Sequence, residues 1–130
     1  MLAPFRSPGE ERIRLNGPQI LLPVDAVVPL SMAFHELTTN ALKYGALSVD
    51  GGRVDIRWQL VNRNDQMVEL LWQEIGGPTV ERARTSGFGT LLIDRALKHD
   101  LDANTEIVFD PQGLRCVVKF RLSAANEVVE

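Results

Sequence analysis

The chain has 130 residues, of which 45% are hydrophobic and 24% are charged, and its formal net charge is −3. This size suits one domain with a single core, and the lack of a concentrated basic charge disfavours nucleic acid as a partner. No apolar run approaches the roughly 18 residues of a membrane span and no signal segment opens the chain, so we expect a cytoplasmic protein, or the cytoplasmic part of a larger one, without direct membrane contact.

The N-terminal part predicts a linker followed by short extended segments. Residues 1–10 contain two prolines and a glycine, a composition typical of a linker remnant from a preceding segment. Residues 12–15 alternate between polar and apolar, residues 19–22 form a short apolar run, and a Gly17-Pro18 turn separates them. We expect two short strands or one hairpin here.

Residues 25–44 form the one long helical segment. At 100° per residue, one face collects the apolar side chains of Val27, Leu30, Phe34, Leu37 and Ala41. Gly45 supplies a signal for the end of the helix. The start stays open, because Asp25 is a capping residue whereas Pro29 fits best in a first turn.

The second half predicts two hairpins with a loop and a helix between them. The strand patterns cover residues 53–61 with 68–72, and residues 105–109 with 114–122. Gly and Pro residues bracket a polar stretch over residues 76–89, which favours a loop.

The helical pattern resumes over residues 90–99. Cys116, the only cysteine, excludes a disulfide scaffold within one chain and is expected in a buried strand. Residues 123–130 are small and acidic, as expected of a tail, so the domain is predicted over residues 11–122. Two helices among long antiparallel pairs predict an α+β fold, a two-layer sandwich with the helices on one face of a mostly antiparallel sheet.

The first helix carries the strongest chemical pattern. Glu36 and Asn40 are four residues apart and Lys43 follows three later, which places them on one face opposite the apolar stripe. Asn40 offers an oxygen to a hard cation such as Mg²⁺, which prefers oxygen ligands shared with phosphates and water. Lys43 offsets phosphate charge, and Glu36 can orient or deprotonate a hydroxyl group or water.

A solvated helix face with a Glu–Lys contact explains the same spacing without any ligand. A zinc helix was the other alternative, because His35 begins a His-Glu pair. That motif requires a second histidine at position 39, where the chain has Thr39, so we reject a zinc site.

A second pattern lies where a predicted strand enters a glycine pair, in Trp72-Gln73-Glu74-Ile75-Gly76-Gly77-Pro78. Trp72 and Glu74 share one strand face. Gly76 and Gly77 let the backbone approach a flat ligand closely, and the Glu74 carboxylate can accept a hydrogen bond from an exocyclic amine, which suits adenine. A strand that merely ends in a tight turn remains the alternative.

A third pattern, Gly87-Phe88-Gly89-Thr90, opens the second helix. Backbone N–H groups at a helix N-terminus bind anions, and glycines expose them, which suits a triphosphate. A single Gly-x-Gly is weak support. The Gly-Lys-Ser/Thr ending of a Walker loop is absent, and Leu92 stands where a dinucleotide fingerprint requires its third glycine.

Together and in this order, the three segments resemble the GHKL ATPase superfamily, whose N box and two glycine boxes they match. His35, Trp72 and Glu74 narrow the resemblance to the catalytic domain of HWE-subfamily sensor histidine kinases, over about residues 2–122. One departure from the wider superfamily is that Glu74 replaces the aspartate that usually begins the first glycine box, as is usual in the HWE group.

The resemblance implies a Bergerat fold, with a mixed sheet backed by helices and ATP bound between the N-box helix and a lid over residues 79–86. It implies that Asn40 coordinates Mg²⁺ and that Glu36 and Lys43 lie near the phosphates. Glu74 would contact the adenine amine beside Trp72. The remaining implied ligand contacts come from the glycine boxes, through Gly76, Gly77, Gly87, Phe88, Gly89 and Thr90.

The implied function is two-component signalling. The domain would donate the ATP γ-phosphate to a histidine on a separate dimerisation segment, and the phosphate would then pass to a response regulator. Neither His35 nor His99 stands in such a segment, so we expect this chain to be monomeric and not to autophosphorylate alone. The alternatives are an ATP-binding regulatory module of the anti-sigma or degenerate-kinase type, and an interaction domain without nucleotide.

Overall fold

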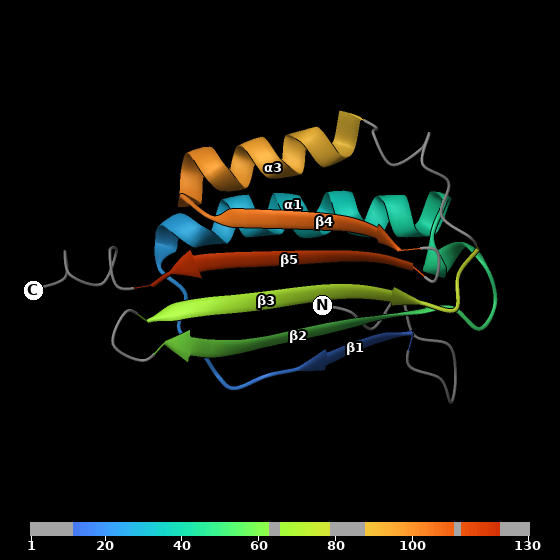
Figure 1. Cartoon of the computed structure of the whole chain (residues 1–130), viewed down its shortest axis with the longest axis horizontal. Coiled ribbons are helices and arrows are strands. Elements are labelled where there is room, and N and C mark those ends of the chain that lie inside the picture. Colours follow the sequence, from blue (N-terminus) through green and yellow to red (C-terminus); the bar gives the residue numbers. More distant parts are fainter. Residues whose placement is uncertain (1–11, 63–65, 79–87, 111–112, 123–130) are drawn as a thin grey trace, which may run out of the picture.

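The computed structural model describes residues 12–62, 66–78, 88–110 and 113–122 (Figure 1). Five strands form one sheet in the order β1-β2-β3-β5-β4. Strand β1 is parallel to β2, and the other neighbours are antiparallel. The predicted α+β class is confirmed, whereas the expected linker, lid and tail lie outside the described residues. Neither helix in the described part has the length and apolarity to cross a membrane.

Of the two short strands predicted at the N-terminal end, only the first forms, and the alternative prediction of a hairpin was wrong. Strand β1 (Ile13–Asn16) pairs in parallel with β2 (Arg53–Asn62), and residues 17–23 form no strand. The physical reason is Trp58 of β2. Its indole packs on the backbone of Gly17, and its Nε1 donates a hydrogen bond of 2.6 Å to the carbonyl of Pro18, so the chain leaves the sheet at this point.

Helix α1 (Val24–Lys43) confirms the predicted long helix, but two details differ. Pro23 occupies the N-cap, so Asp25 lies inside the first turn and Pro29 beyond it. The buried face follows smaller side chains than expected, and Val27 is 49% exposed. Small residues let the helix lie close to its neighbours. The buried residues of the helix are Ala26, Pro29, Leu30, Ala33, Leu37 and Ala41.

The two predicted hairpins are confirmed. Strand β3 (Met67–Ile75) pairs with β2, and β4 (Asn104–Asp110) pairs with β5 (Gly113–Arg121). Strand β3 also pairs with β5, so Trp72 lies opposite Cys116 in the middle of the sheet, where both side chains are buried. The expectation of a buried strand cysteine is therefore correct.

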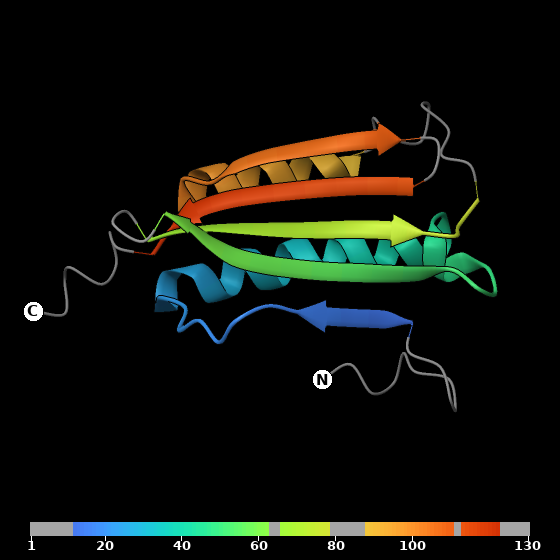
Figure 2. The same cartoon turned by 60° about the horizontal axis from the view of Figure 1, so that its bottom comes forward.

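Helix α3 (Phe88–Leu101) packs beside α1, and both cover the same face of the sheet (Figures 1 and 2). The core lies between the two layers, with Leu30, Leu37 and Leu97 from the helices and Trp72 and Phe120 from the strands. The C-terminal end of α1, the C-terminal end of β3 and the N-terminal end of α3 lie at one end of the molecule (Figure 2). The described parts of the three sequence patterns thus lie toward that end.

Candidate functional site

The polar face of α1 is available to a ligand. Glu36 and Asn40 are half-buried and Lys43 is exposed, all in the last two turns of the helix. The structure gives none of these three side chains a hydrogen bond or ion pair with a described residue. His35 is exposed on a neighbouring part of the helix surface. The helix therefore carries a carboxylate, an amide and an ammonium group on one face, and no described residue bonds to any of them.

Glu74 differs sharply from these residues, because it is buried and each of its two oxygens accepts a hydrogen bond. Its side chain is 5% exposed. The backbone N–H of Ala46 donates a 3.0 Å hydrogen bond to Oε1, and the indole Nε1 of Trp72 donates a 3.1 Å hydrogen bond to Oε2. Burial raises the pKa of Glu74 above its ordinary value, while these two hydrogen bonds oppose the rise.

The turn after α1 lies against Oε1 of Glu74. Gly45 follows the helix, and the 3-10 turn η2 (Ala46–Ser48) begins directly after it. A Cβ atom on Gly45 would lie 2.1 Å from Glu74 Oε1, and the φ of Gly45 is −110°. Gly45 is therefore glycine because Glu74 occupies the space of a side chain, not because the backbone is left-handed.

The first glycine box packs against the same turn. A Cβ on Gly77 would lie 2.6 Å from Ala46 Cα, and Gly76 has a positive φ of 77°. Both glycines are thus required by the local structure of the protein. Whether they also admit the adenine ring, as the sequence predicts, stays a prediction.

The second glycine box opens a helix, as expected. Helix α3 begins at Phe88, and Gly89 and Thr90 follow in its first turn, while Gly87 lies outside the described residues. The first turn of α3 lies toward the end of the molecule where α1 ends (Figure 2), and the N–H groups of a first helical turn have no partner within the helix. An anion placed there would meet a positive helix terminus.

The sequence did not predict three supports of this site. The contact between Gly45 and Glu74 was missed, although the glycine itself was noticed as a helix end. The hydrogen bond from Trp72 was missed, although both residues were known to share a strand face. The contribution of Arg12, which binds the turn after α1, left no recognisable signal, because an isolated arginine before a strand has many roles.

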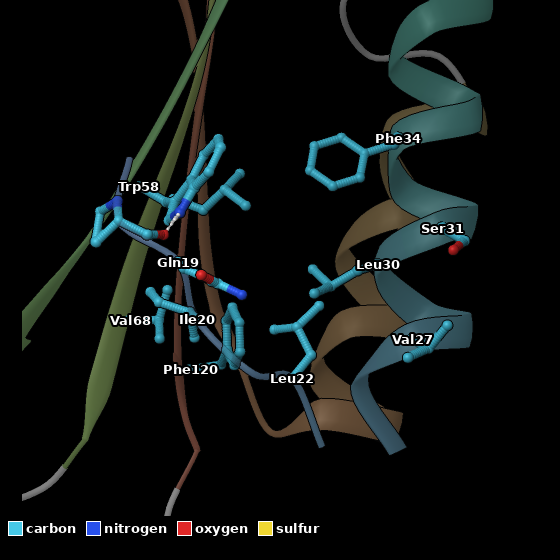
Figure 3. A pocket seen from close by; sticks show the side chains of 12 residues that line it. Gln19, Ile20, Leu22, Val27, Leu30, Ser31, Phe34, Trp58, Val68 and Phe120 are labelled. Carbon is cyan, nitrogen blue, oxygen red and sulfur yellow. Dashed lines mark hydrogen bonds between the residues drawn. The ribbon is translucent and has the colours of Figure 1, made fainter. Parts of the chain in front are cut away.

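One cavity lined by described residues lies away from the predicted site. It has a volume of about 420 Å³ and lies between the N-terminal half of α1 and the sheet (Figure 3). Its lining is almost wholly apolar, with Gln19 and Ser31 as polar members, and it contains no charged side chain. A triphosphate requires local cations or N–H donors, so this cavity does not suit one. Leu30, Phe34, Trp58 and Phe120 point into it.

Comparison with known proteins finds histidine kinases among the sequence relatives, in agreement with the family that the motifs resemble. The chain is 44% identical over 121 residues to Blue-light-activated histidine kinase 1 of Erythrobacter litoralis, covering 91% of this chain and 32% of that protein. It is 42% identical over 114 residues to the blue-light-activated histidine kinase of Brucella anthropi, covering 87% of this chain and 23% of that protein. The chain thus spans about a quarter to a third of these relatives. No protein-family model matches it.

Solved structures share the fold at much lower identity. The histidine kinase domain from the Erythrobacter litoralis EL346 blue-light-activated kinase has a TM-score of 0.70 at 16% identity, covering 94% of this chain and 61% of that one. The catalytic domain of the histidine kinase ThkA has a TM-score of 0.64 at 10% identity, covering 85% of this chain and 78% of that one. By its sequence and its fold together, this chain belongs to the catalytic domains of histidine kinases.

Proposed function

We propose that this chain binds ATP and Mg²⁺ at the end of the molecule where α1, β3 and α3 meet. We further propose that it donates the γ-phosphoryl group to a histidine on a separate dimerisation segment. In the complete kinase, the phosphoryl group would pass from that histidine to an aspartate of a response regulator. The reaction belongs in the cytoplasm, where ATP is available.

The observation that carries this proposal is the environment of Glu74. A buried carboxylate lowers stability unless its charge is compensated, and no described cation bonds to Glu74. Two N–H donors instead hold it at the end of β3, beside the turn that follows the free polar face of α1. A buried carboxylate that has a raised pKa and is held by two donors is a candidate for a functional residue.

The residues at this end of the molecule fit the chemistry of ATP and magnesium. Glu74 can accept from the adenine amine, and the first turn of α3 can bind phosphate oxygens. Asn40 supplies one oxygen ligand for Mg²⁺. Among the described residues, no three His, Cys, Asp or Glu side chains gather, which suits a magnesium ion held mainly by phosphates and water. When bound, this ion neutralises phosphate charge.

The remaining polar residues of α1 support transfer rather than binding. Glu36 is proposed to orient the attacking group or accept its proton, and Lys43 to balance phosphate charge. Catalysis would consist mostly of positioning and charge stabilisation.

The relatives support the proposed reaction and its partners. Both sequence relatives are named as blue-light-activated histidine kinases. A structure of ThkA in complex with the response regulator TrrA has a TM-score of 0.54, at 15% identity, covering 85% of this chain and 34% of that one. Because the chain spans only part of its relatives, the histidine, the light response and the regulator of a complete kinase are not assigned to it.

Calorimetric titration with ATP, with and without Mg²⁺, tests the nucleotide site. We expect saturable binding to the wild type. Asn40→Ala should lose the magnesium dependence selectively, because it removes one oxygen ligand, and Glu74→Ala should weaken binding in both conditions. A folded wild type without saturable binding would overturn the proposal.

Phosphotransfer separates the kinase from a regulatory ATP-binding module. The chain is mixed with a supplied histidine-bearing dimerisation segment and radiolabelled ATP. We expect labelling of the segment that disappears with Asn40→Ala. ATP binding without any labelling would instead favour the regulatory module.

A further inference from the structure

We propose that Trp72 is a positioning residue for adenine recognition: its indole N–H and the backbone N–H of Ala46 fix the two oxygens of Glu74, so that the carboxylate accepts from the exocyclic amine of the base. This inference rests on the proposed function and deepens it. It assigns to Trp72 a role in base selectivity that is separate from its packing in the core.

The first step of the argument is the geometry of the pair. Trp72 and Glu74 are two apart on β3, so both side chains point to the same face of the sheet. Trp72 is 1% exposed and Glu74 is 5% exposed. The indole Nε1 is a donor only, and it donates to Glu74 Oε2 over 3.1 Å. The carboxylate is therefore tied to a ring that cannot move independently of the core.

The ring itself is held by α1. Its centroid lies 6.3 Å from that of Phe34, with an interplanar angle of 34°. Phe34 is half-buried in the middle of the helix that also carries Asn40. The orientation of Glu74 is thus coupled, through Trp72 and Phe34, to the helix that bears the proposed phosphate-side residues.

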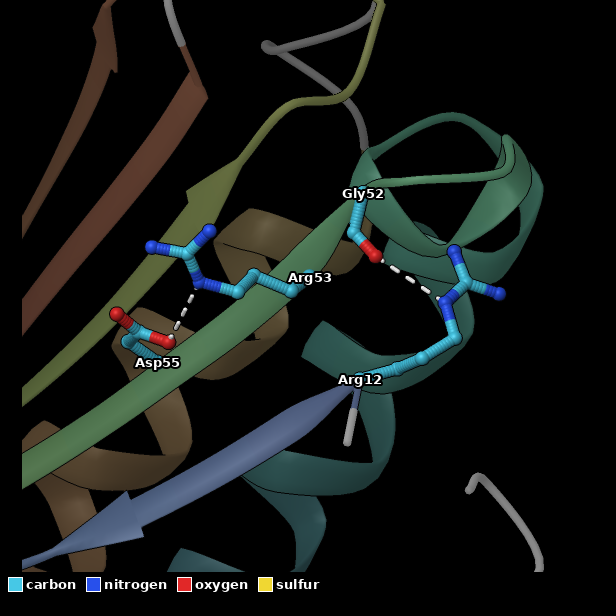
Figure 4. Close-up of polar contacts among 4 residues, drawn as sticks. All are labelled: Arg12, Gly52, Arg53 and Asp55. Atoms are coloured by element: carbon cyan, nitrogen blue, oxygen red, sulfur yellow. Dashed lines mark hydrogen bonds and ion pairs between the residues drawn. The ribbon is translucent and has the colours of Figure 1, made fainter. Parts of the chain in front are cut away.

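The second donor is held by Arg12. Its guanidinium donates to the carbonyls of Ala46 at 3.2 Å, Val49 at 2.5 Å and Gly52 at 3.1 Å. Figure 4 shows the contact with Gly52 at the point where β1 begins. Arg12 therefore holds the turn that begins at Ala46 through three hydrogen bonds. The backbone N–H of Ala46 in turn donates to Glu74 Oε1.

The two bonds leave Glu74 with acceptor capacity in defined directions. A carboxylate has about four lone-pair positions, and Ala46 and Trp72 occupy two of them. A site built to accept from an amine rejects a ligand that lacks it, because a buried acceptor is then left unpaired. Because both oxygens of Glu74 are held, the carboxylate cannot rotate to find another donor when the ligand lacks the amine.

No charged group is among the causes that shift the pKa of Glu74. Val54 lies opposite Glu74 on β2. The charged residues on either side of it, Arg53 and Asp55, point to the other face of the sheet and pair with each other at 3.3 Å (Figure 4). The turn η2 contains no titratable side chain. The charge state of Glu74 therefore depends on burial, Ala46 and Trp72.

The experiment compares the affinities of two nucleotides, ATP and purine riboside triphosphate, which lacks only the exocyclic amine. We expect the wild type to prefer ATP by at least about tenfold. Trp72→Phe keeps an aromatic ring but removes the donor, and should bring this ratio close to one with little change in the affinity for the analogue. The control is Trp58→Phe, which loses an indole bond to Pro18 far from Glu74 and should keep the wild-type ratio.

The pH profile provides a second readout that a purely structural role would not change. Trp72→Phe removes a donor that lowers the pKa of Glu74, so its ATP affinity should fall on acidification at a higher pH than in the wild type. Gly45→Ala covers the case in which Trp72→Phe does not fold. It leaves the indole in place and displaces Glu74 Oε1, so it should also lose the preference for ATP.

Two results would overturn the inference. One is equal weakening of both nucleotides in Trp72→Phe, which would assign Trp72 to packing alone. The other is a wild type that binds both nucleotides equally, which would show that Glu74 does not read the amine while ATP binding still stands. Failure of the proposed function is distinguishable, because the wild type would then bind neither nucleotide.

Discussion

At the scale of single residues, Glu74 combines a charge with a buried position. Its environment opposes ionisation through desolvation and favours it through two hydrogen bonds, and the net effect raises its pKa. A raised pKa means that the folded protein binds the proton more tightly than the unfolded chain does. The carboxylate therefore affects the pH dependence of stability, in addition to the role in nucleotide recognition that we propose for it.

The pH dependence can be predicted with its sign. The stabilising contribution of the Glu74 proton is fully present below the ordinary pKa of 4.5 and is lost as the pH rises through the higher folded value. Glu74→Gln cannot titrate. The difference in unfolding free energy, wild type minus Glu74→Gln, should therefore decrease from pH 4.5 towards neutrality.

Urea unfolding at a series of pH values, followed by tryptophan fluorescence, measures this difference. Because Gln presents an N–H₂ group to one of the two donors, the variant should also be less stable throughout. A difference that is constant with pH, or that grows as the pH rises, would contradict the predicted direction of the pKa shift.

At the scale of elements, the turn over residues 46–52 links three parts of the fold. It follows α1, precedes β2, and is held by Arg12 at the beginning of β1. The parallel pairing of β1 with β2 brings Arg12 to this place, and the backbone N–H of Val54 also donates to the carbonyl of Arg12 at 2.8 Å. The beginning of the edge strand thus supports the turn beside Glu74.

Arg12→Ala tests this support. It removes three hydrogen bonds to carbonyl groups and should lower the free energy of unfolding by about 1–3 kcal/mol. Arg14→Ala is the matched control, because Arg14 is exposed on the same strand and should change stability by less than about 0.5 kcal/mol. Urea unfolding followed by circular dichroism measures both. Equal changes in unfolding free energy for the two variants would show that the three hydrogen bonds of Arg12 do not stabilise the turn.

At the scale of the whole molecule, the core encloses Cys116 in the central part of the sheet. The residue is 0% exposed, and desolvation, followed by the charge of Asp94, raises the pKa of its thiol to about 12. A thiol of this kind is unreactive while the fold is intact, because the thiolate is the reactive form. The rate at which the Cys116 thiol reacts therefore measures how often the core opens.

Maleimide labelling at pH 8 should be slower in the folded protein than in urea by at least about a hundredfold. If ATP binds the folded state, adding ATP with Mg²⁺ should slow labelling further, because binding reduces the open population. Mass spectrometry measures the labelled fraction over time. Equal labelling rates in the folded and denatured protein would contradict the burial of Cys116.

The features that could be predicted from the sequence all depend on residues within one segment of the chain. The periods of hydrophobic residues predicted α1, α3 and both hairpins, because the period of a helix or strand is a property of the segment itself. The spacing of Glu36, Asn40 and Lys43 predicted a common face for the same reason. The start of the helix stayed open between Asp25 and Pro29, because it depends on how the preceding chain reaches the helix.

Only the tertiary structure decided the features that join distant segments. The hydrogen bond between Trp58 and Pro18 joins residues 40 apart, and the hydrogen bond between Ala46 and Glu74 joins residues 28 apart. The sequence by itself determined most of the elements and the candidate residues, because hydrophobic periods and residue spacings are local properties, and the resemblance of its motifs indicated the family. The burial of Glu74, the need for Gly45 and the support from Arg12 follow from packing, which depends on the whole fold.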